Sequence, residues 1–451
     1  MWTWLSHFWG RISASLWFLP VLMSLGALAL AVVIVFLDEP LATAMGNYGY
    51  LYGGDVESAR ELLSAVASSI ITVTGVAFSV TMVALSLTSS QFGPHLLANF
   101  MRDRGNQVVL GGFIGTFLFC LLALGTVTTD AESHASLSAS IALLLAGISM
   151  MLLIYFIHHI ASSMQADHVI ELVAGEAGRA LDRLFPAESE QASPPKPEPR
   201  EAREIPVEAP RTGYLQAIDE DGLTRLATSR NLRLDVLHRP GHYVIEGRPL
   251  VAVSTGPELD DEVIRRIQRG FIIGGHRAPE QDPEYGIHQL VEVAVRALSS
   301  GINDPYTAVA CVDRLTGVLC RIGPRRVRSA KRADEDGHLR LTLDTTDFAG
   351  VLDAAFNQIR QSATDQPAVT LRLLESLSLI ATTVESASRR EAIARQGAMV
   401  MAAHRDVLVS DDRVALEQRY RSLQDALVKG CTDNAPGRPS PPESDRAAAP
   451  G

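Results

Sequence analysis

The chain contains little lysine and little cysteine, and it lacks the common catalytic motifs. Its only lysines are Lys196, Lys331 and Lys429. Its four cysteines, which form no C-x-x-C pair, are Cys120, Cys311, Cys320 and Cys431. This spacing indicates free thiols rather than a disulfide framework or a thiolate metal site. Neither a Walker A sequence nor a G-x-S-x-G, H-E-x-x-H or G-x-G-x-x-G motif occurs, so we expect no enzyme activity, no cofactor and no bound metal.

Basic charge is in deficit, whereas long apolar stretches are abundant. The formal net charge of −11 argues against nucleic acid as a partner. At 451 residues and 47 % hydrophobic content, the chain suits a membrane domain with one or two soluble domains. The segments of transmembrane length are Leu16–Leu37, Ser64–Leu87, Val108–Val127 and Leu137–Ile160. None of them contains an acidic residue, a lysine or an arginine, which argues against a proton-coupled transporter.

The loops between these segments predict an orientation in the bilayer. Arg102 and Arg104 lie between the second and third segments, and Arg179 and Arg183 follow the fourth. The other two loops are acidic, and Arg60 is their single basic residue. Because short cytoplasmic loops are enriched in arginine and lysine, we expect both termini in the cytoplasm.

The second segment carries a row of small and polar residues. On a helix that turns about 100° per residue, these residues share one arc with a single methionine. This polar stripe comprises Ser64, Ser68, Thr72, Gly75, Ser79, Met82, Ser86 and Ser90. Two interpretations stay open: close packing against another helix, or the wall of a water-filled pore in a homo-oligomer. A second row, Thr74, Thr81 and Thr88, lies roughly 140° away and is expected to contact the first or third segment.

The loop Gln91–Gln107 is a candidate for coupling the membrane segments to the rest of the chain. Gly93 and Pro94 interrupt the second segment there, and an amphipathic stretch follows. The residues expected to form this coupling loop are Gln91, Phe92, Pro94, Arg102, Asp103 and Arg104. The alternative is that the loop only ends the span and fixes the topology through its positive charge.

Composition divides the chain into five parts. The expected parts are a transmembrane domain with a helical extension (1–185), a Pro-rich linker (186–210), a small β unit (211–256), a helical domain (257–429) and a disordered tail (430–451). Strands expected at 213–218, 232–237, 243–245 and 249–253 predict a barrel-like β unit with turns at Gly241 and Gly247. The expected fold is a four-helix transmembrane domain with a cytoplasmic α+β region.

Several motifs resemble those of one bacterial membrane-protein family. They lie at Ser89–Gln107, His238–Gly241, Gln281–Asp282 and Ala297–Ala308. From the first segment to about Leu427, the chain is similar to the predicted bacterial membrane-protein family catalogued as domain of unknown function 2254. The resemblance implies an inner-membrane location and a common layout, and it brings no assigned activity.

Two of these motifs also admit a functional interpretation. Ser299–Pro305 has the pattern of a helix-turn-helix corner, with Gly301 after one helix and Asp304 as the N-cap of the next. The alternative is a cytoplasmic polar pocket for an ion or metabolite, formed by Arg277, Asp282, Asn303 and Asp304.

The arginine-rich run 321–332 indicates either a solvated loop or contact with lipid headgroups.

These features favour a homo-oligomeric ion channel or passive transport protein of the bacterial inner membrane. The second segment would line the pore, and the cytoplasmic region would regulate it. The expected partners are the lipid bilayer, further copies of the chain and a small ion or metabolite. A membrane-anchored sensor or interaction module without a pore is the alternative, and an enzyme acting on lipids or envelope precursors ranks third.

Overall fold

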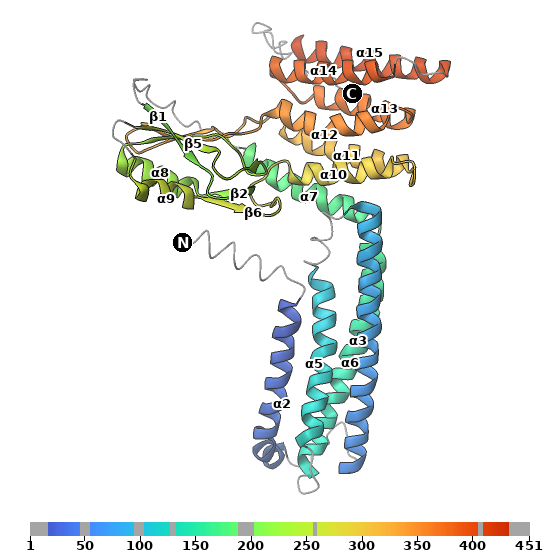
Figure 1. Ribbon diagram of the computed structural model, residues 1–451. Coiled ribbons are helices and arrows are strands. Elements are labelled where there is room, and N and C mark those ends of the chain that lie inside the picture. The colour runs from blue at the N-terminus through green and yellow to red at the C-terminus, as the bar shows by residue number, and fades with distance from the viewer. Residues whose placement is uncertain are drawn as a thin grey trace, which may run out of the picture. The chain divides into compact units, whose positions relative to one another are not determined.

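A computed structural model describes residues 17–45, 55–93, 103–126, 132–187, 203–255, 259–404 and 409–432. The chain divides into two compact units, Met1–Val169 and Ile170–Gly451. The first unit consists of long apolar helices, and the second combines two β-sheets with further helices (Figure 1).

Long helices lie side by side in the first unit (Figure 1). They are α2 (Phe18–Met45), α3 (Val56–Phe92), α5 (Arg104–Thr126) and α6 (Glu132–Ser163). Helix α3 begins after Asp55, whose carboxylate accepts a hydrogen bond from the Ser58 N–H at 3.1 Å. It ends before Gly93, whose φ of 112° favours glycine. Each helix is longer than the apolar segment predicted for it, because helical hydrogen bonding continues beyond the apolar residues.

Helix α5 is the centre of this unit. Half of its most apolar window is buried, against 22 % for α3 and α6. It approaches α2 closely at two glycines of a G-x-x-x-G sequence. A Cβ atom on Gly111 would lie 2.7 Å from Met23 Sδ, and one on Gly115 would lie 3.3 Å from Ala27 Cβ. These small residues therefore let the two helix backbones pack together.

Three helices of the described residues are long and apolar enough to cross a membrane. They are Val56–Gln91, Arg104–Thr126 and Leu137–Ser163. The first expected span, Leu16–Leu37, lies largely in α2, where the described apolar stretch is Phe18–Ile34. This first span therefore stays a prediction.

The second unit contains two β-sheets around one apolar core. The strands are β1 (Arg203–Glu208), β2 (Gly213–Ile218), β3 (Arg233–Val236), β4 (Tyr243–Val244), β5 (Pro249–Thr255), β6 (Phe271–Gly274), β7 (Lys331–Ala333) and β8 (Leu339–Thr342). One sheet has the order β1-β5-β3-β8-β7 and the other the order β4-β2-β6. Helices α8 (Glu220–Arg230) and α9 (Asp261–Arg269) contribute Leu223 and Ile267 to the core.

The barrel-like β unit expected from the sequence is wrong, because the described strands form two open sheets. All four expected strands exist as β2 to β5, but they divide between the two sheets. The larger sheet also recruits strands from outside residues 211–256. Strand β1 lies inside the expected linker and pairs antiparallel with β5, and β8 pairs in parallel with β3 at Leu234 and Leu341. Distant partners therefore complete a sheet that local sequence cannot close.

The remaining helices of the described chain pack in successive layers within the second unit (Figure 1). They are α7 (Ala166–Leu184), which enters this unit from the first, and α10 (Tyr285–Ala297), α11 (Pro305–Ile322), α12 (Phe348–Ser362), α13 (Pro367–Ala381), α14 (Ala387–Ala403) and α15 (Ser410–Thr432). The helical domain predicted after residue 257 thus contains α9 to α15, but it also supplies three strands to the sheets.

Candidate functional site

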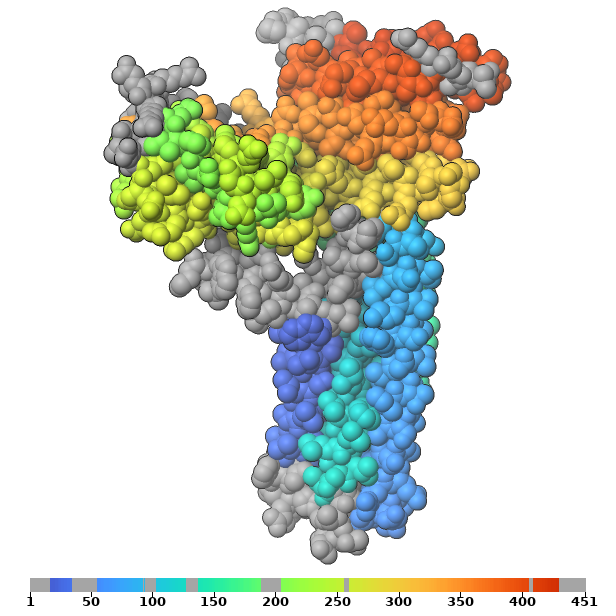
Figure 2. All heavy atoms as spheres, in the orientation of Figure 1, coloured from blue at the N-terminus to red at the C-terminus, as the bar shows by residue number. Residues whose placement is uncertain are grey.

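Helix α3 presents its polar stripe to the outside of the first unit. All eight stripe residues are exposed: Ser64, Ser68, Thr72, Gly75, Ser79, Met82, Ser86 and Ser90. On the opposite side of the helix, Thr74, Thr81 and Thr88 are buried, in line with Ile70, Ala77 and Ala84, which pack against α5 and α6. The threonine row, which was expected to contact the first or third segment, is thus buried on the face of α3 that packs against α5 and α6. Figure 2 shows α3 at the edge of the helix bundle with one face uncovered along its length.

Both faces of α3 contain hydroxyl groups with and without a hydrogen-bond partner. On the stripe, Thr72 Oγ1 donates to the Ser68 carbonyl at 2.8 Å, and on the buried face Thr88 Oγ1 has no partner among the described residues. On the buried face, Thr74 Oγ1 donates to the Ile70 carbonyl at 2.6 Å. On the stripe, the hydroxyls of Ser68, Ser79 and Ser86 have no hydrogen-bond partner among the residues that the structure describes. Hydroxyl groups without a hydrogen-bond partner are unfavourable in hydrocarbon, so we expect this face of α3 to contact water or another protein surface.

No described helix of the chain packs against the stripe. A Cβ atom on Gly75 would meet nothing within 4 Å, whereas one on Gly111 would meet α2. The two glycines therefore have different roles. Gly111 allows α5 to pack closely against α2 within one chain, whereas Gly75 leaves the outer face of α3 without a side chain at that position.

The predicted coupling loop is only partly described. Gln91 is exposed in the last turn of α3, and Phe92 is the final residue of that helix. Asp103 precedes α5, and Arg104 is the exposed first residue of α5. The two coupling residues that lie outside the described residues are Pro94 and Arg102.

Asp103 joins the start of α5 to the end of α6. Its Oδ2 lies 2.5 Å from Nε2 of His159, and its Oδ1 accepts a hydrogen bond from the Gly105 N–H at 2.8 Å. The Tyr155 ring stacks on the His159 ring, with centroids 5.2 Å apart. A Cβ atom on Gly105 would lie 2.7 Å from His159 Nε2. Glycine at this position therefore leaves room for the carboxylate–imidazole pair.

In the second unit, two residues of the predicted polar pocket form a buried ion pair. The Arg277 Nε–H donates to Asp282 Oδ2 at 2.6 Å, and only 1 % of the Asp282 side chain is exposed. Arg277 Nη1 lies 2.6 Å from His288 Nδ1. Gly241 has a φ of 95°, and a Cβ atom there would lie 2.4 Å from Asp282 Oδ2. The motif glycine therefore makes room for the motif carboxylate.

Two histidines beside this ion pair favour their neutral form. Burial lowers the pKa of His288, and the charge of Arg277 lowers it further. Burial also lowers the pKa of His242, together with the charge of Arg239. Both effects act against the protonated imidazole. A neutral His288 can accept a hydrogen bond from the Arg277 N–H at Nδ1, so the lowered pKa is consistent with this contact.

Asn303 and Asp304 lie beyond the other end of α10. This helix has 13 residues, so about 20 Å of helix separates them from the Arg277–Asp282 pair. Asp304 caps α11 by accepting hydrogen bonds from the N–H groups of its first turn. Asn303 Oδ1 accepts a hydrogen bond from Gln366 at 2.9 Å. The four residues therefore lie at two places, and the corner interpretation accounts for Asp304.

The corner between α10 and α11 differs from the predicted one in the position of its glycine relative to the end of the helix. Helix α10 ends at Ala297, several positions before Gly301. Asn303, with a φ of 51°, has the left-handed backbone. Asparagine tolerates this conformation better than most residues with side chains. The glycine expected to end the helix therefore lies in the turn itself.

A cavity of about 260 Å³ lies next to the motif Gln281–Asp282. Its charged lining residues are Arg183, Arg239, Arg328, Arg332, Glu220, Glu280 and Asp344. Arg239 pairs with Glu284 at 2.9 Å, and Asp344 lies 3.7 Å from the same guanidinium. This cavity therefore combines several arginines with fewer carboxylates.

The arginine-rich run 321–332 contacts acidic residues of α7 and α8. Arg325 lies 2.7 Å from Asp182, and Arg332 lies 2.9 Å from Glu220. Part of the run is therefore held by ion pairs, whereas Arg326 and Arg328 are exposed as expected for a solvated loop. Its acidic partners lie far away in the sequence, which is why local composition did not reveal them.

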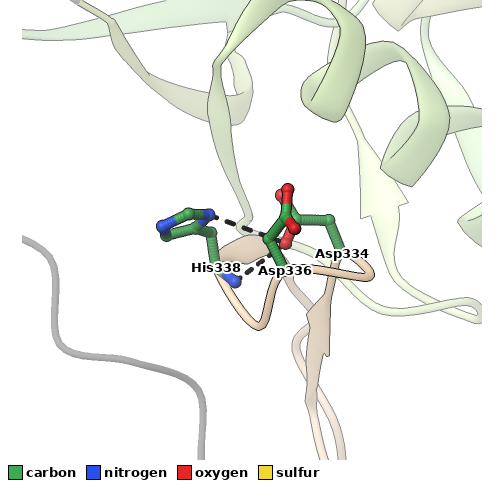
Figure 3. Close-up of side chains that lie close together, drawn as sticks. All are labelled: Asp334, Asp336 and His338. Atoms are coloured by element: carbon green, nitrogen blue, oxygen red, sulfur yellow. Dashed lines mark hydrogen bonds and ion pairs between the residues drawn. The ribbon is translucent and has the colours of Figure 1, made fainter.

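The turn between β7 and β8 brings Asp334, Asp336 and His338 together (Figure 3). Their potential ligand atoms lie within 4.8 Å of one another. However, Asp334 Oδ2 accepts a hydrogen bond from Arg340 Nε at 2.7 Å, and its Oδ1 accepts one from the His338 N–H at 2.8 Å. The hairpin turn and this ion pair explain the cluster, and we assign no metal to it.

Sequence reasoning missed two of these groups. The motif His238–Gly241 marked the segment that contains Arg239, but its partners Glu284 and Asp344 come from other parts of the chain. The pair of Asp103 and His159 had only a weak signal, namely that both residues lie at the same expected membrane boundary. Contacts between distant segments were not visible in either case.

Long apolar helices beside a folded α+β unit define a predicted membrane protein. The chain belongs to the family described as Predicted membrane protein (DUF2254), whose model matches residues 13–378. It is 33 % identical over 416 residues to the uncharacterised protein Rv1290c of Mycobacterium tuberculosis, and equally to the uncharacterised protein Mb1321c of Mycobacterium bovis. These alignments cover 87 % of this chain and 76 % of each relative. No solved structure matches the chain.

Proposed function

We propose that this protein is a homo-oligomeric channel or passive transport protein of the bacterial inner membrane, with α3 of each copy along the conducting path. In this proposal α2 is the fourth span, and both termini and the second unit lie in the cytoplasm. The arginines of the short loops support this orientation. The second unit then regulates the path.

The outward-facing polar stripe of α3 carries the proposal. A single copy in a bilayer would place the unpartnered hydroxyls of Ser68, Ser79 and Ser86 against lipid. Several copies arranged around an axis, with α3 innermost, would place the same hydroxyls against water. Hydroxyl groups in a pore can coordinate passing ions without holding them as tightly as carboxylates do.

The absence of charge along α3 supports passive conduction. Between Ser64 and Ser90 the helix contains no acidic residue, lysine or arginine. Coupled transporters generally use intramembrane ionisable residues to bind and release protons. A path lined by hydroxyls alone offers no group of this kind, so conduction down a gradient is the simpler mechanism.

Single-channel recording of the purified full-length protein in planar bilayers tests the proposal. We expect conductance from the wild-type protein and a severalfold lower conductance from Ser79→Leu and Ser86→Leu, because leucine narrows and dries the path. Val80→Leu is the matched control. Val80 is 41 % exposed and lies about 100° around the helix from Ser79. Absence of wild-type conductance, or an equal effect of the control, would contradict the proposal.

Cysteine labelling separates the pore from the alternative function. In a chain whose native cysteines are replaced by serine, Ser68→Cys, Ser79→Cys and Ser86→Cys should react with a water-soluble maleimide. Val80→Cys should not react, because it faces lipid. Protection of all the stripe positions together with zero conductance would instead favour a membrane-anchored sensor or interaction module.

A further inference from the structure

Two arginines beside the cavity of the second unit are only weakly paired: Arg183 has no acidic partner among the described residues, and Arg328 makes one long ion pair. Arg183, in the last turn of α7, makes no side-chain ion pair or hydrogen bond with any residue that the structure describes. The carboxylate oxygen nearest to Arg328, Glu220 Oε2, lies 3.9 Å away, and 56 % of the Arg328 side chain is exposed. Both arginines line the same cavity.

The backbone holds these two arginines close to each other. The Arg328 N–H donates a hydrogen bond to the carbonyl of Leu184 at 2.8 Å, and Leu184 follows Arg183 directly in the chain. Both side chains line the same cavity, and like charges that share a cavity disfavour each other. An anion between them would remove this repulsion and would gain charge-assisted hydrogen bonds.

The other arginines of the cavity already have partners. Glu220 accepts Arg332 at 2.9 Å, so it cannot also neutralise Arg328 fully. Glu284 pairs with Arg239 at 2.9 Å. These two ion pairs form part of the cavity wall and leave the positive charges of Arg183 and Arg328 available to a ligand.

The wall of the cavity is also fixed by hydrogen bonds. The side-chain amide of Gln281 accepts the Ile218 N–H at 2.9 Å and donates to the Ile218 carbonyl at 3.2 Å, as a neighbouring strand would. Hydroxyl groups of Ser329, Thr345 and Thr346 add hydrogen-bond donors to the lining. The charged side chains of the lining are four arginines against the carboxylates of Glu220, Glu280 and Asp344, which is an excess of one positive charge.

We infer that this cavity binds a phosphate group through Arg183 and Arg328. The guanidinium fork matches the oxygens of a phosphate, and a doubly charged phosphate balances two arginines better than a single carboxylate does. The volume of about 260 Å³ suits a small ligand. The phosphate can belong to a small soluble metabolite or to a lipid headgroup, since both offer the same chemistry.

Isothermal titration of the full-length protein in phosphatidylcholine nanodiscs tests this inference, with inorganic phosphate and pyrophosphate as the probes. We expect saturable binding of at least one probe. The double variant Arg183→Gln with Arg328→Gln should lose about tenfold or more in affinity, because it removes the charge-assisted hydrogen bonds to the probe. Saturable binding of neither probe would overturn the inference.

The matched control removes the same charges outside the cavity. Arg179 lies one turn before Arg183 on α7, Arg326 lies two positions before Arg328, and both are exposed. Arg179→Gln with Arg326→Gln should keep the wild-type affinity, and equal losses in the two double variants would overturn the inference. Thermal unfolding checks that all variants are folded, which we expect because the substituted side chains are exposed.

Changing the disc lipid identifies the source of the phosphate. If discs that contain phosphatidylglycerol weaken pyrophosphate binding in the wild-type protein but not in the Arg183→Gln, Arg328→Gln variant, a lipid headgroup competes for the cavity. If the affinity of the wild-type protein is unchanged, the site takes a soluble phosphate. These measurements record binding without current, so they stand or fall independently of the pore proposal.

Discussion

At the scale of single residues, Gly241 is the position where a small change should have a large effect. Alanine there would require a φ of 95° and would bring its Cβ atom 2.4 Å from Asp282 Oδ2. We predict that Gly241→Ala lowers the free energy of unfolding of the second unit by roughly 2 kcal/mol or more, because backbone strain adds to displacement of a buried carboxylate. Urea unfolding of the full-length protein in detergent, followed by circular dichroism, measures this change.

Gly275 offers the comparison for that prediction. A Cβ atom on Gly275 would meet nothing within 4 Å, so Gly275→Ala should leave the unfolding free energy within about 0.5 kcal/mol of the wild-type value. If Gly241→Ala were equally harmless, the close approach between Gly241 and Asp282 would not describe the folded protein.

The contact of His288 with Arg277 predicts a dependence of stability on pH. Burial and the charge of Arg277 lower the pKa of His288 in the folded chain below the ordinary value of 6.5. Between these two pKa values the unfolded chain binds more protons, so the stability contributed by neutral His288 is complete above pH 6.5 and is lost as the pH falls. Urea unfolding between pH 7.5 and pH 5 should therefore show decreasing stability of the second unit.

His288→Asn keeps a hydrogen-bond acceptor for Arg277 and removes the titration. We expect this variant to lose part of the decrease at low pH. An identical pH profile in the wild-type protein and in His288→Asn would contradict the role given to His288.

Sequence reasoning identified single residues better than their contacts. Asp282 and Gly241 lie in family-like motifs and Arg277 belonged to the predicted polar pocket, and the structure brings these three together. Asn303 was grouped with them, although it lies past the far end of α10. A motif records which residues matter, but only the path of the helix between them decides whether they meet.

At the scale of elements, the contact between α2 and α5 depends on glycine. A side chain on Gly111 would collide with Met23 Sδ and with the Pro20 backbone, at 2.7 and 3.1 Å from the added Cβ. We predict that Gly111→Leu lowers the thermal stability of the detergent-solubilised protein by an amount that corresponds to about 1–3 kcal/mol of overpacking. Gly147→Leu on α6, where a Cβ would meet nothing within 4 Å, should leave the melting temperature unchanged.

The elements that sequence reasoning found and missed differ in their apolar content. The long helices of the first unit and strands β2 to β5 have clear apolar patterns. Helix α8 buries only Leu223, Leu226 and Ala227 among polar and charged neighbours, and β7 begins with Lys331 and Arg332. Such elements are held by partners elsewhere in the chain, so their own sequence gives little sign of them.

At the scale of the whole molecule, the proposed orientation can be checked with fusion proteins. A fluorescent reporter that folds only in the cytoplasm should be active when it is fused after Ala187, and inactive when it is fused after Asp130. Alkaline phosphatase, which is active only after export, should give the reverse result. Activity of alkaline phosphatase after Ala187 would show that the second unit is exported and would remove the cytoplasmic part of the proposed function.

The order of synthesis matters for the larger sheet of the second unit. Strand β3 leaves the ribosome about a hundred residues before β8, its parallel partner, which corresponds to roughly 5 to 20 s at ordinary rates of translation. During that interval one edge of β3 has backbone groups without their final partner, and such edges attract other chains. A nascent chain that stalls before Leu339 would therefore present an open strand edge, and rapid translation from β3 to β8 would protect the protein from aggregation.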